Sequence, residues 1–114
     1  MSYDRIGVIG AMDSELAALI AALTQPAQET VQGLVFHTGR LGAREVVLVR
    51  CGIGKVSAAR CTQVLIDRFA PGAVINTGIA GGLASGLAVG DIVVADGLVQ
   101  HDFDAAPIGF VRGC

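Results

Sequence analysis

The sequence is poor in the residues that recognise nucleic acids and anionic membranes. It has no tryptophan and one tyrosine, only 16% of its residues are charged, and the formal net charge is −2. It therefore offers neither an aromatic platform for stacking bases nor a basic surface for phosphates. Nucleic acid and membrane surfaces are excluded as expected partners on these grounds.

Cysteine and targeting signals are scarce as well. The three cysteines, Cys51, Cys61 and Cys114, are odd in number and lack metal-ligand spacing, which argues against both a disulfide framework and a zinc site. No basic segment followed by a long apolar run opens the chain, so a secretory signal is not expected. We expect buried, reduced thiols and a cytoplasmic location.

Apolar residues and glycine are abundant by contrast, at 53% hydrophobic residues and 16 glycines in 114 residues. Residues 70–90 carry no charge and have glycines spaced four apart at Gly78, Gly82, Gly86 and Gly90, a pattern that also occurs in paired membrane helices. In a helix, each glycine costs about 1 kcal/mol against alanine. The stretch is therefore interpreted as a strand followed by a glycine-rich loop.

The order of apolar patterns predicts an α/β domain with a largely parallel sheet. A helix begins at a cap of Asp13 or Ser14 and ends before Pro26, and a second helix over residues 56–69 has Ala58, Cys61, Leu65 and Phe69 on its apolar face. Strands are expected over residues 5–10, 34–38, 45–50, 72–78 and 91–95, with residues 34–50 forming a hairpin. The chain length allows one domain.

Three predicted strand ends carry small residues, and ligands of open α/β sheets bind at such ends. They are Gly10-Ala11-Met12, Gly52-Ile53-Gly54-Lys55 and the loop over residues 78–82. The second resembles a phosphate loop, but Val49 replaces its first glycine and Val56 replaces the Ser or Thr after the lysine. A nucleotide phosphate is therefore not predicted.

Two groups of polar residues each allow two interpretations. Glu15 in the first helical turn either complements the helix dipole or is a carboxylate that holds a water as general base. His101, Asp102 and Asp104 form an HDxD cluster, which suits either metal ligands or structural hydrogen bonds. The residues alone favour the structural interpretation in both cases.

Four segments together resemble the bacterial 5′-methylthioadenosine/S-adenosylhomocysteine nucleosidases of the nucleoside phosphorylase superfamily. They are IGVIGAMDSEL, RCGIGKVSAA, VINTGIAGGLASGLAVGDIVV and QHDFDAAPIGF, in order from Arg5 to Phe110. The resemblance implies a three-layer α/β/α fold around a mixed, largely parallel sheet. This chain would be the N-terminal part of one such domain, over residues 1–114.

The resemblance also implies hydrolysis of the N-glycosidic bond, releasing adenine and a thioribose product, in methionine salvage. Glu15 would be the catalytic base. The substrate-binding residues would be Met12, Ile53, Ile79, Ala80 and Gly81, with Ala105 and Ile108 closing the site of the partner subunit in a homodimer. Neither a metal nor another cofactor is implied; the partner is a small nucleoside.

Some features depart from the family pattern. Ile79 stands where a serine is common, and Ile108 where an aromatic is common. Family members are about twice as long, and their general acid would lie beyond Cys114, so the 114 residues alone are expected to have little activity. The alternatives are another hydrolase of the superfamily, such as one acting on futalosine, a phosphorylase, or a non-catalytic nucleoside-binding paralogue. The GAMDSE loop offers an acid and no phosphate-binding arginine, which favours water over phosphate.

Overall fold

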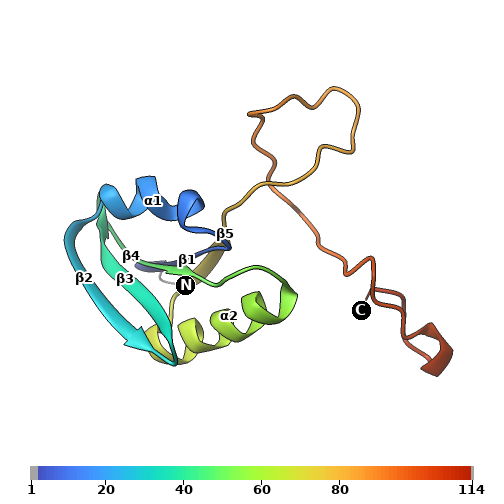
Figure 1. The fold of residues 1–114 in the computed structure, drawn as a ribbon, viewed down its shortest axis with the longest axis horizontal. Coiled ribbons are helices and arrows are strands. Elements are labelled where there is room, and N and C mark those ends of the chain that lie inside the picture. Colours follow the sequence, from blue (N-terminus) through green and yellow to red (C-terminus); the bar gives the residue numbers. More distant parts are fainter. Residues whose placement is uncertain (1–2, 114) are drawn as a thin grey trace. The chain divides into compact units, whose positions relative to one another are not determined.

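The computed structural model describes residues 3–113, which form two units, one up to Ala80 and one from Gly81 onward. All strands and both α-helices belong to the first unit (Figure 1). They are β1 (Arg5–Gly10), α1 (Asp13–Ala21), β2 (Thr24–Val31), β3 (Leu34–Leu41), β4 (Arg44–Arg50), α2 (Lys55–Phe69) and β5 (Ala73–Asn76).

The five strands form one mixed sheet in the order β2-β3-β4-β1-β5. β1 runs parallel to both β4 and β5, whereas β2, β3 and β4 form an antiparallel meander. The expected hairpin is thus confirmed between β3 and β4. Parallel pairing is confined to β4-β1-β5, so the sheet is mixed, with its parallel part on one side.

The two helices cover opposite faces of the sheet (Figure 1). Side chains alternate along β4: Val46 and Leu48 pack with Leu16 of α1, whereas Val47 and Val49 belong to the cluster around Leu65 of α2. The expected apolar face of α2 is confirmed, with Cys61, Leu65 and Phe69 buried and Ala58 half-buried. The three-layer α/β/α arrangement follows from this alternation.

Both cysteines of the first unit are buried free thiols within the α2 cluster. Burial, together with the neighbouring Cys51, raises the pKa of the Cys61 thiol to about 11, against the opposing effect of Arg60. Cys61 is therefore protonated at neutral pH and packs as a small apolar side chain.

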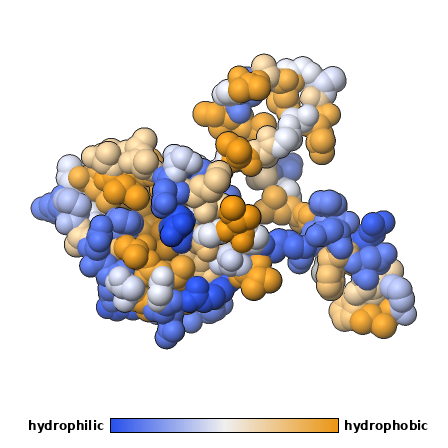
Figure 2. All heavy atoms as spheres, viewed as in Figure 1, coloured by the Kyte–Doolittle hydropathy of each residue, from blue (hydrophilic) through white to orange (hydrophobic). Residues whose placement is uncertain are grey.

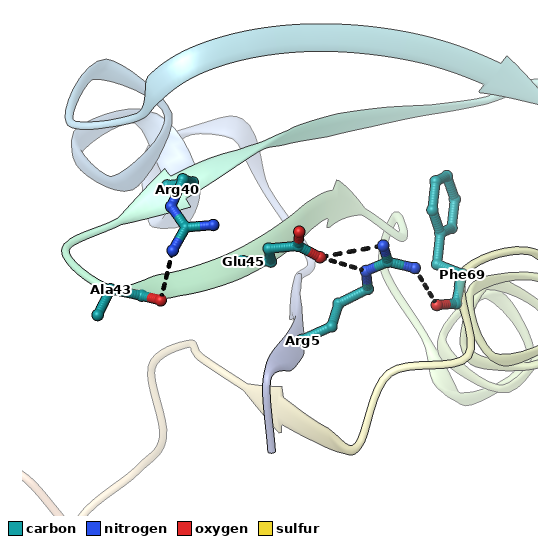
Figure 3. A network of polar contacts seen from close by, with 5 residues as sticks. All are labelled: Arg5, Arg40, Ala43, Glu45 and Phe69. Carbon is teal, nitrogen blue, oxygen red and sulfur yellow. Dashed lines mark hydrogen bonds and ion pairs between the residues drawn. The ribbon is translucent and has the colours of Figure 1, made fainter. Parts of the chain in front are cut away.

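A polar network ties β1, β4 and α2 together at the amino ends of the two strands (Figure 3). The Arg5 guanidinium donates through Nε and Nη2 to Glu45 Oε2, at 3.2 and 3.0 Å, and through Nη1 to the Phe69 carbonyl at 2.8 Å. The Arg5 and Glu45 side chains are 44% and 48% exposed, so solvent screens the pair and its contribution is less than about 1 kcal/mol.

Three expectations from the sequence were wrong. β2 was not predicted, and Pro26 lies inside this strand at the edge of the sheet. β5 is not buried: Val74 and Ile75 are 39% and 50% exposed, because no described strand covers its outer edge. Residues 91–95 form no strand, since none of the described strands pairs with them.

The second unit consists of turns and one short 3₁₀ helix, η1 (Ala106–Ile108). Its backbone closes a loop through the Gly113 N–H, which donates to the Phe103 carbonyl at 3.0 Å. Asp104 Oδ1 accepts from the Ala106 N–H at 3.0 Å, so this acid of the HDxD cluster has the structural role. Nearly all of its residues are exposed, including many apolar ones, which are orange in Figure 2.

Candidate functional site

The carboxyl ends of β1, β4 and β5 lie at one edge of the sheet because these strands are parallel. Two backbone hydrogen bonds continue the pairing beyond the strands. The Cys51 N–H donates to the Gly10 carbonyl, and the Thr77 N–H donates to the Ile9 carbonyl, both at 2.9 Å. The three glycine-bearing segments predicted from the sequence therefore do begin at a common edge.

Glu15 lies at this edge, in the first turn of α1. Its Oε2 accepts hydrogen bonds from the Ala11 N–H at 2.6 Å and from the Met12 N–H at 3.1 Å. Neither Asp13 nor Ser14 caps the helix as expected: α1 begins at Asp13, and the glutamate reaches back to the amide preceding it. A glutamate at the third helical position can do this, whereas Asp13 and Ser14 lie already inside the helix.

The other carboxylate oxygen of Glu15 lies next to the end of β5. A Cβ built at Gly78 would be 3.3 Å from Oε1, and one built at Gly10 would be 3.3 Å from Oε2 and 2.9 Å from Leu16 Cγ. Two glycines from different strand ends thus leave room for the carboxylate. The half-buried Glu15 side chain has one oxygen held by backbone amides and one that accepts no hydrogen bond from a described residue.

The other predicted residues of the first unit lie in the segments that follow the three strands. Met12 is 37% exposed, Ile53 79% and Ile79 86%, and Ala80 is exposed as well. Ile53 lies between Gly52 and Gly54, whose φ angles of +84° and +101° require glycine for the turn into α2. Glu15, Met12, Ile53 and Ile79 therefore all follow carboxyl ends at one edge of the sheet.

The remaining predicted residues, Gly81, Ala105 and Ile108, belong to the second unit. Ala105 is half-buried and immediately precedes η1, and Ile108 ends it with 76% of its surface exposed. A Cβ built at Gly81 would have no heavy atom within 4 Å apart from those of the two neighbouring residues in the chain, so the backbone is open there.

Two charged residues near the same edge were not singled out from the sequence. Arg50 ends β4, and its Nε lies 3.2 Å from Asp13 Oδ1 of α1, with both side chains largely exposed. An arginine is thus near the edge, contrary to what the first loop alone indicates, but its charge is paired with Asp13. Strand register could have located Arg50, because it pairs with Gly10.

A hollow of about 450 Å³ lies at the opposite end of the strands and is lined by Arg5, Glu29, Glu45 and Arg68 among others. These charges are paired with one another, Arg5 with Glu45 and Arg68 with Glu29, so they are not free to hold a ligand. Within residues 3–113, no three His, Cys, Asp or Glu side chains are grouped as metal ligands would be. None of the described helices is long and apolar enough to cross a membrane.

The chain is similar to known proteins over nearly its whole length. The family model described as the phosphorylase superfamily matches residues 5–113. The 5′-methylthioadenosine/S-adenosylhomocysteine nucleosidases of Shewanella putrefaciens and Shewanella pealeana are 48% and 45% identical to it over 109 residues, or 96% of this chain.

Solved structures agree with this. The S-adenosylhomocysteine nucleosidase of Streptococcus pyogenes, in complex with 5-methylthiotubericidin, superposes with a TM-score of 0.94 at 45% identity and covers 100% of this chain. The nucleosidase of Colwellia psychrerythraea, in complex with adenine, gives 0.95 at 44% identity over 99% of it. The chain spans about half the length of these relatives, between 47% and 48%.

Proposed function

The chain belongs to the phosphorylase superfamily, and we propose that its protein is a nucleosidase that hydrolyses the N-glycosidic bond of 5′-methylthioadenosine and S-adenosylhomocysteine. Adenine and a thioribose product are released. The observation that carries this proposal is the Glu15 carboxylate at the common strand edge, with Oε2 fixed by two backbone amides and Oε1 left for a ligand. The names of the relatives supply the substrates.

In the proposed reaction, Glu15 acts as general base toward water. Its ionised carboxylate accepts a proton from the water through Oε1 as the oxygen attacks the anomeric carbon, while the bond from that carbon to adenine breaks. The Ala11 and Met12 amides hold Oε2 and so orient the carboxylate before the reaction. An acid protonates adenine as it leaves, which balances the proton taken from water.

The substrate would contact residues from each of the three segments. Met12 and Ile53 line the ribose and alkylthio pocket, and Ile79, Ala80 and Gly81 lie near the reacting centre and the base. In the proposed homodimer, Ala105 and Ile108 of one subunit close the alkylthio pocket of the other. The exposure of Met12, Ile53, Ile79 and Ile108 supports this assignment, because such apolar side chains are available for a ligand or a subunit.

We propose further that activity requires the part of the relatives that the chain does not span, which would provide the acid. Methionine salvage in a reducing compartment such as the cytoplasm completes the proposal. The free thiols of Cys51 and Cys61 support a reducing compartment.

Product identity tests the proposed reaction. For this we define the completed protein as residues 1–114 joined to the portion of the S. putrefaciens nucleosidase that the chain does not cover. Incubated with methylthioadenosine, it is expected to give adenine and methylthioribose in mass spectra, at the same rate with and without phosphate. A sugar 1-phosphate, or a rate that depends on phosphate, would identify a phosphorylase instead. The 114 residues alone are expected to release little adenine.

Replacing Gly78 by alanine is expected to slow adenine release by the completed protein about tenfold, because a displacement of a few tenths of an ångström matters for a positioned base. The added methyl group would lie 3.3 Å from Glu15 Oε1 and press on the carboxylate. Steady-state kinetics should show the loss mainly in kcat. Gly97→Ala is the matched control, since no other heavy atom lies within 4 Å of a Cβ there. Equal rates for the two variants would exclude the role of Gly78.

A further inference from the structure

The two edges of the sheet differ in how well they are protected from pairing. At one edge, β2 carries Pro26, which lacks an N–H, a register shift between Thr24 and Ala27, and the charged Glu29. These are devices by which proteins prevent an edge strand from pairing with other chains. β5 at the other edge has the sequence AVIN, with no charge, no proline and no register shift.

The side chains of β5 are those of an interior strand. Successive residues point to opposite faces of a sheet, so Val74 and Ile75 place apolar side chains on both faces. They are 39% and 50% exposed, whereas the equally apolar β1 and β4 are buried on both faces by α1 and α2. Parallel strands are normally buried on both faces. β5 thus has the composition of a strand with neighbours but only one neighbour, β1, among the described strands.

The second unit indicates independently that further polypeptide is needed. Its exposed large apolar residues include Leu83, Val89, Ile92, Val94 and Leu98, each at least 89% exposed. The superpositions with TM-scores of 0.94 and 0.95 extend over 99–100% of the chain and so include this unit. The path of these residues is therefore that of folded relatives, although the described residues do not bury them. Those relatives contain about as much chain again, which this chain does not match.

We propose that the free edge of β5 binds a strand from the polypeptide that corresponds to the uncovered part of the nucleosidases. The partner segment is apolar on both faces, as a strand next to β5 must be to sit inside the sheet. It can be carried on the same chain or on a separate one. The first unit is then a preformed half of a domain, and the β5 edge is where the two halves join.

A second copy of this chain is the weaker candidate for this edge. A two-fold axis would pair β5 with itself in an antiparallel manner over four residues, about 13 Å of strand. Stable interfaces bury about 1,200–2,000 Å² in total, far more than such a short contact provides.

Mixing the two halves as separate polypeptides tests the proposal. The 114-residue chain and the uncovered part of the S. putrefaciens nucleosidase are expected to form a 1:1 complex, detected by analytical ultracentrifugation and native mass spectrometry. Hydrogen exchange of residues 73–76 is expected to slow at least about tenfold on mixing, since pairing protects strand amides. Ile75→Lys should weaken the complex at least about tenfold by placing a charge in the joint.

Thr30→Lys on the β2 edge is the matched control, because Thr30 is equally exposed at the opposite edge, and it should leave the affinity unchanged. If the separate half does not fold, the completed protein replaces the mixture, with slow exchange of β5 expected there and fast exchange in the chain alone. Three results would overturn the proposal: equal exchange in both, equal effects of the two lysines, or protection of β5 through self-association. Binding and exchange need no substrate, so a failure here is distinct from a failure of the proposed activity.

Discussion

Replacing Glu15 by glutamine in the completed protein is expected to lower adenine release from methylthioadenosine about 10²- to 10⁴-fold. The amide keeps the size of the carboxylate and one oxygen acceptor but cannot take the proton of the attacking water. Binding should change little, because the residues proposed to contact the nucleoside remain. Steady-state kinetics in phosphate-free buffer gives the rate, and calorimetry with 5-methylthiotubericidin gives the affinity.

Asp13→Asn is the matched control for this variant. Asp13 is an acid in the same helical turn, but its side chain is 86% exposed and paired with Arg50. Its loss should reduce the rate by less than about threefold, since a surface ion pair contributes at most about 1 kcal/mol. Near-normal turnover of the Glu15 variant, or equal losses in the two variants, would rule out Glu15 as the base.

Replacing Phe36 by alanine is expected to destabilise the completed protein by about 3–5 kcal/mol. Phe36 of β3 is fully buried, and its ring centroid lies 4.8 Å from that of Phe69 at the end of α2. The truncation leaves a cavity between the sheet and the helix that follows the Gly52–Gly54 turn. Such a loss is large compared with the total stability of about 5–15 kcal/mol typical of a domain. Urea unfolding followed by far-ultraviolet circular dichroism measures it.

Val35→Ala provides the comparison for Phe36. Val35 is the preceding residue of β3, points to the other face and is 43% exposed, so its truncation should cost less than about 1 kcal/mol. If both variants lost the same free energy of unfolding, the cluster of α2 with the sheet would not be the core that the packing indicates.

The sequence predicted those elements whose pattern is set by the core. Cys61, Leu65 and Phe69 recur at helical spacing because one face of α2 packs on the sheet. The glycine-rich strand ends were also recognisable, since glycine is required at Gly52 and Gly54 by their positive φ angles. These features are local consequences of packing and backbone geometry, so a single sequence reveals them.

The features that were missed depend on pairing between distant segments. β2 has a polar sequence with Pro26 and is a strand because it pairs with β3, not because of its composition. β5 and residues 91–95 look alike in sequence, yet only β5 has a pairing strand among the described residues. The approach of Gly78 to Glu15 depends on β5 lying beside β1, which no local pattern indicates.

The account depends most on the position of the Glu15 carboxylate relative to the nucleoside. Two amides hold its Oε2, and two glycines leave space around it, at the edge where three parallel strands end. This geometry is present in a chain that covers about half of its relatives. A direct observation of the ligand at this edge is therefore the decisive one.

A crystal structure of the completed protein with 5-methylthiotubericidin provides that observation. The account predicts a water molecule within about 2.6–3.2 Å of Glu15 Oε1, facing the anomeric carbon of the ligand, with Oε2 still held by the Ala11 and Met12 amides. A ligand bound away from this edge, or a Glu15 carboxylate turned away from the anomeric carbon, would contradict it.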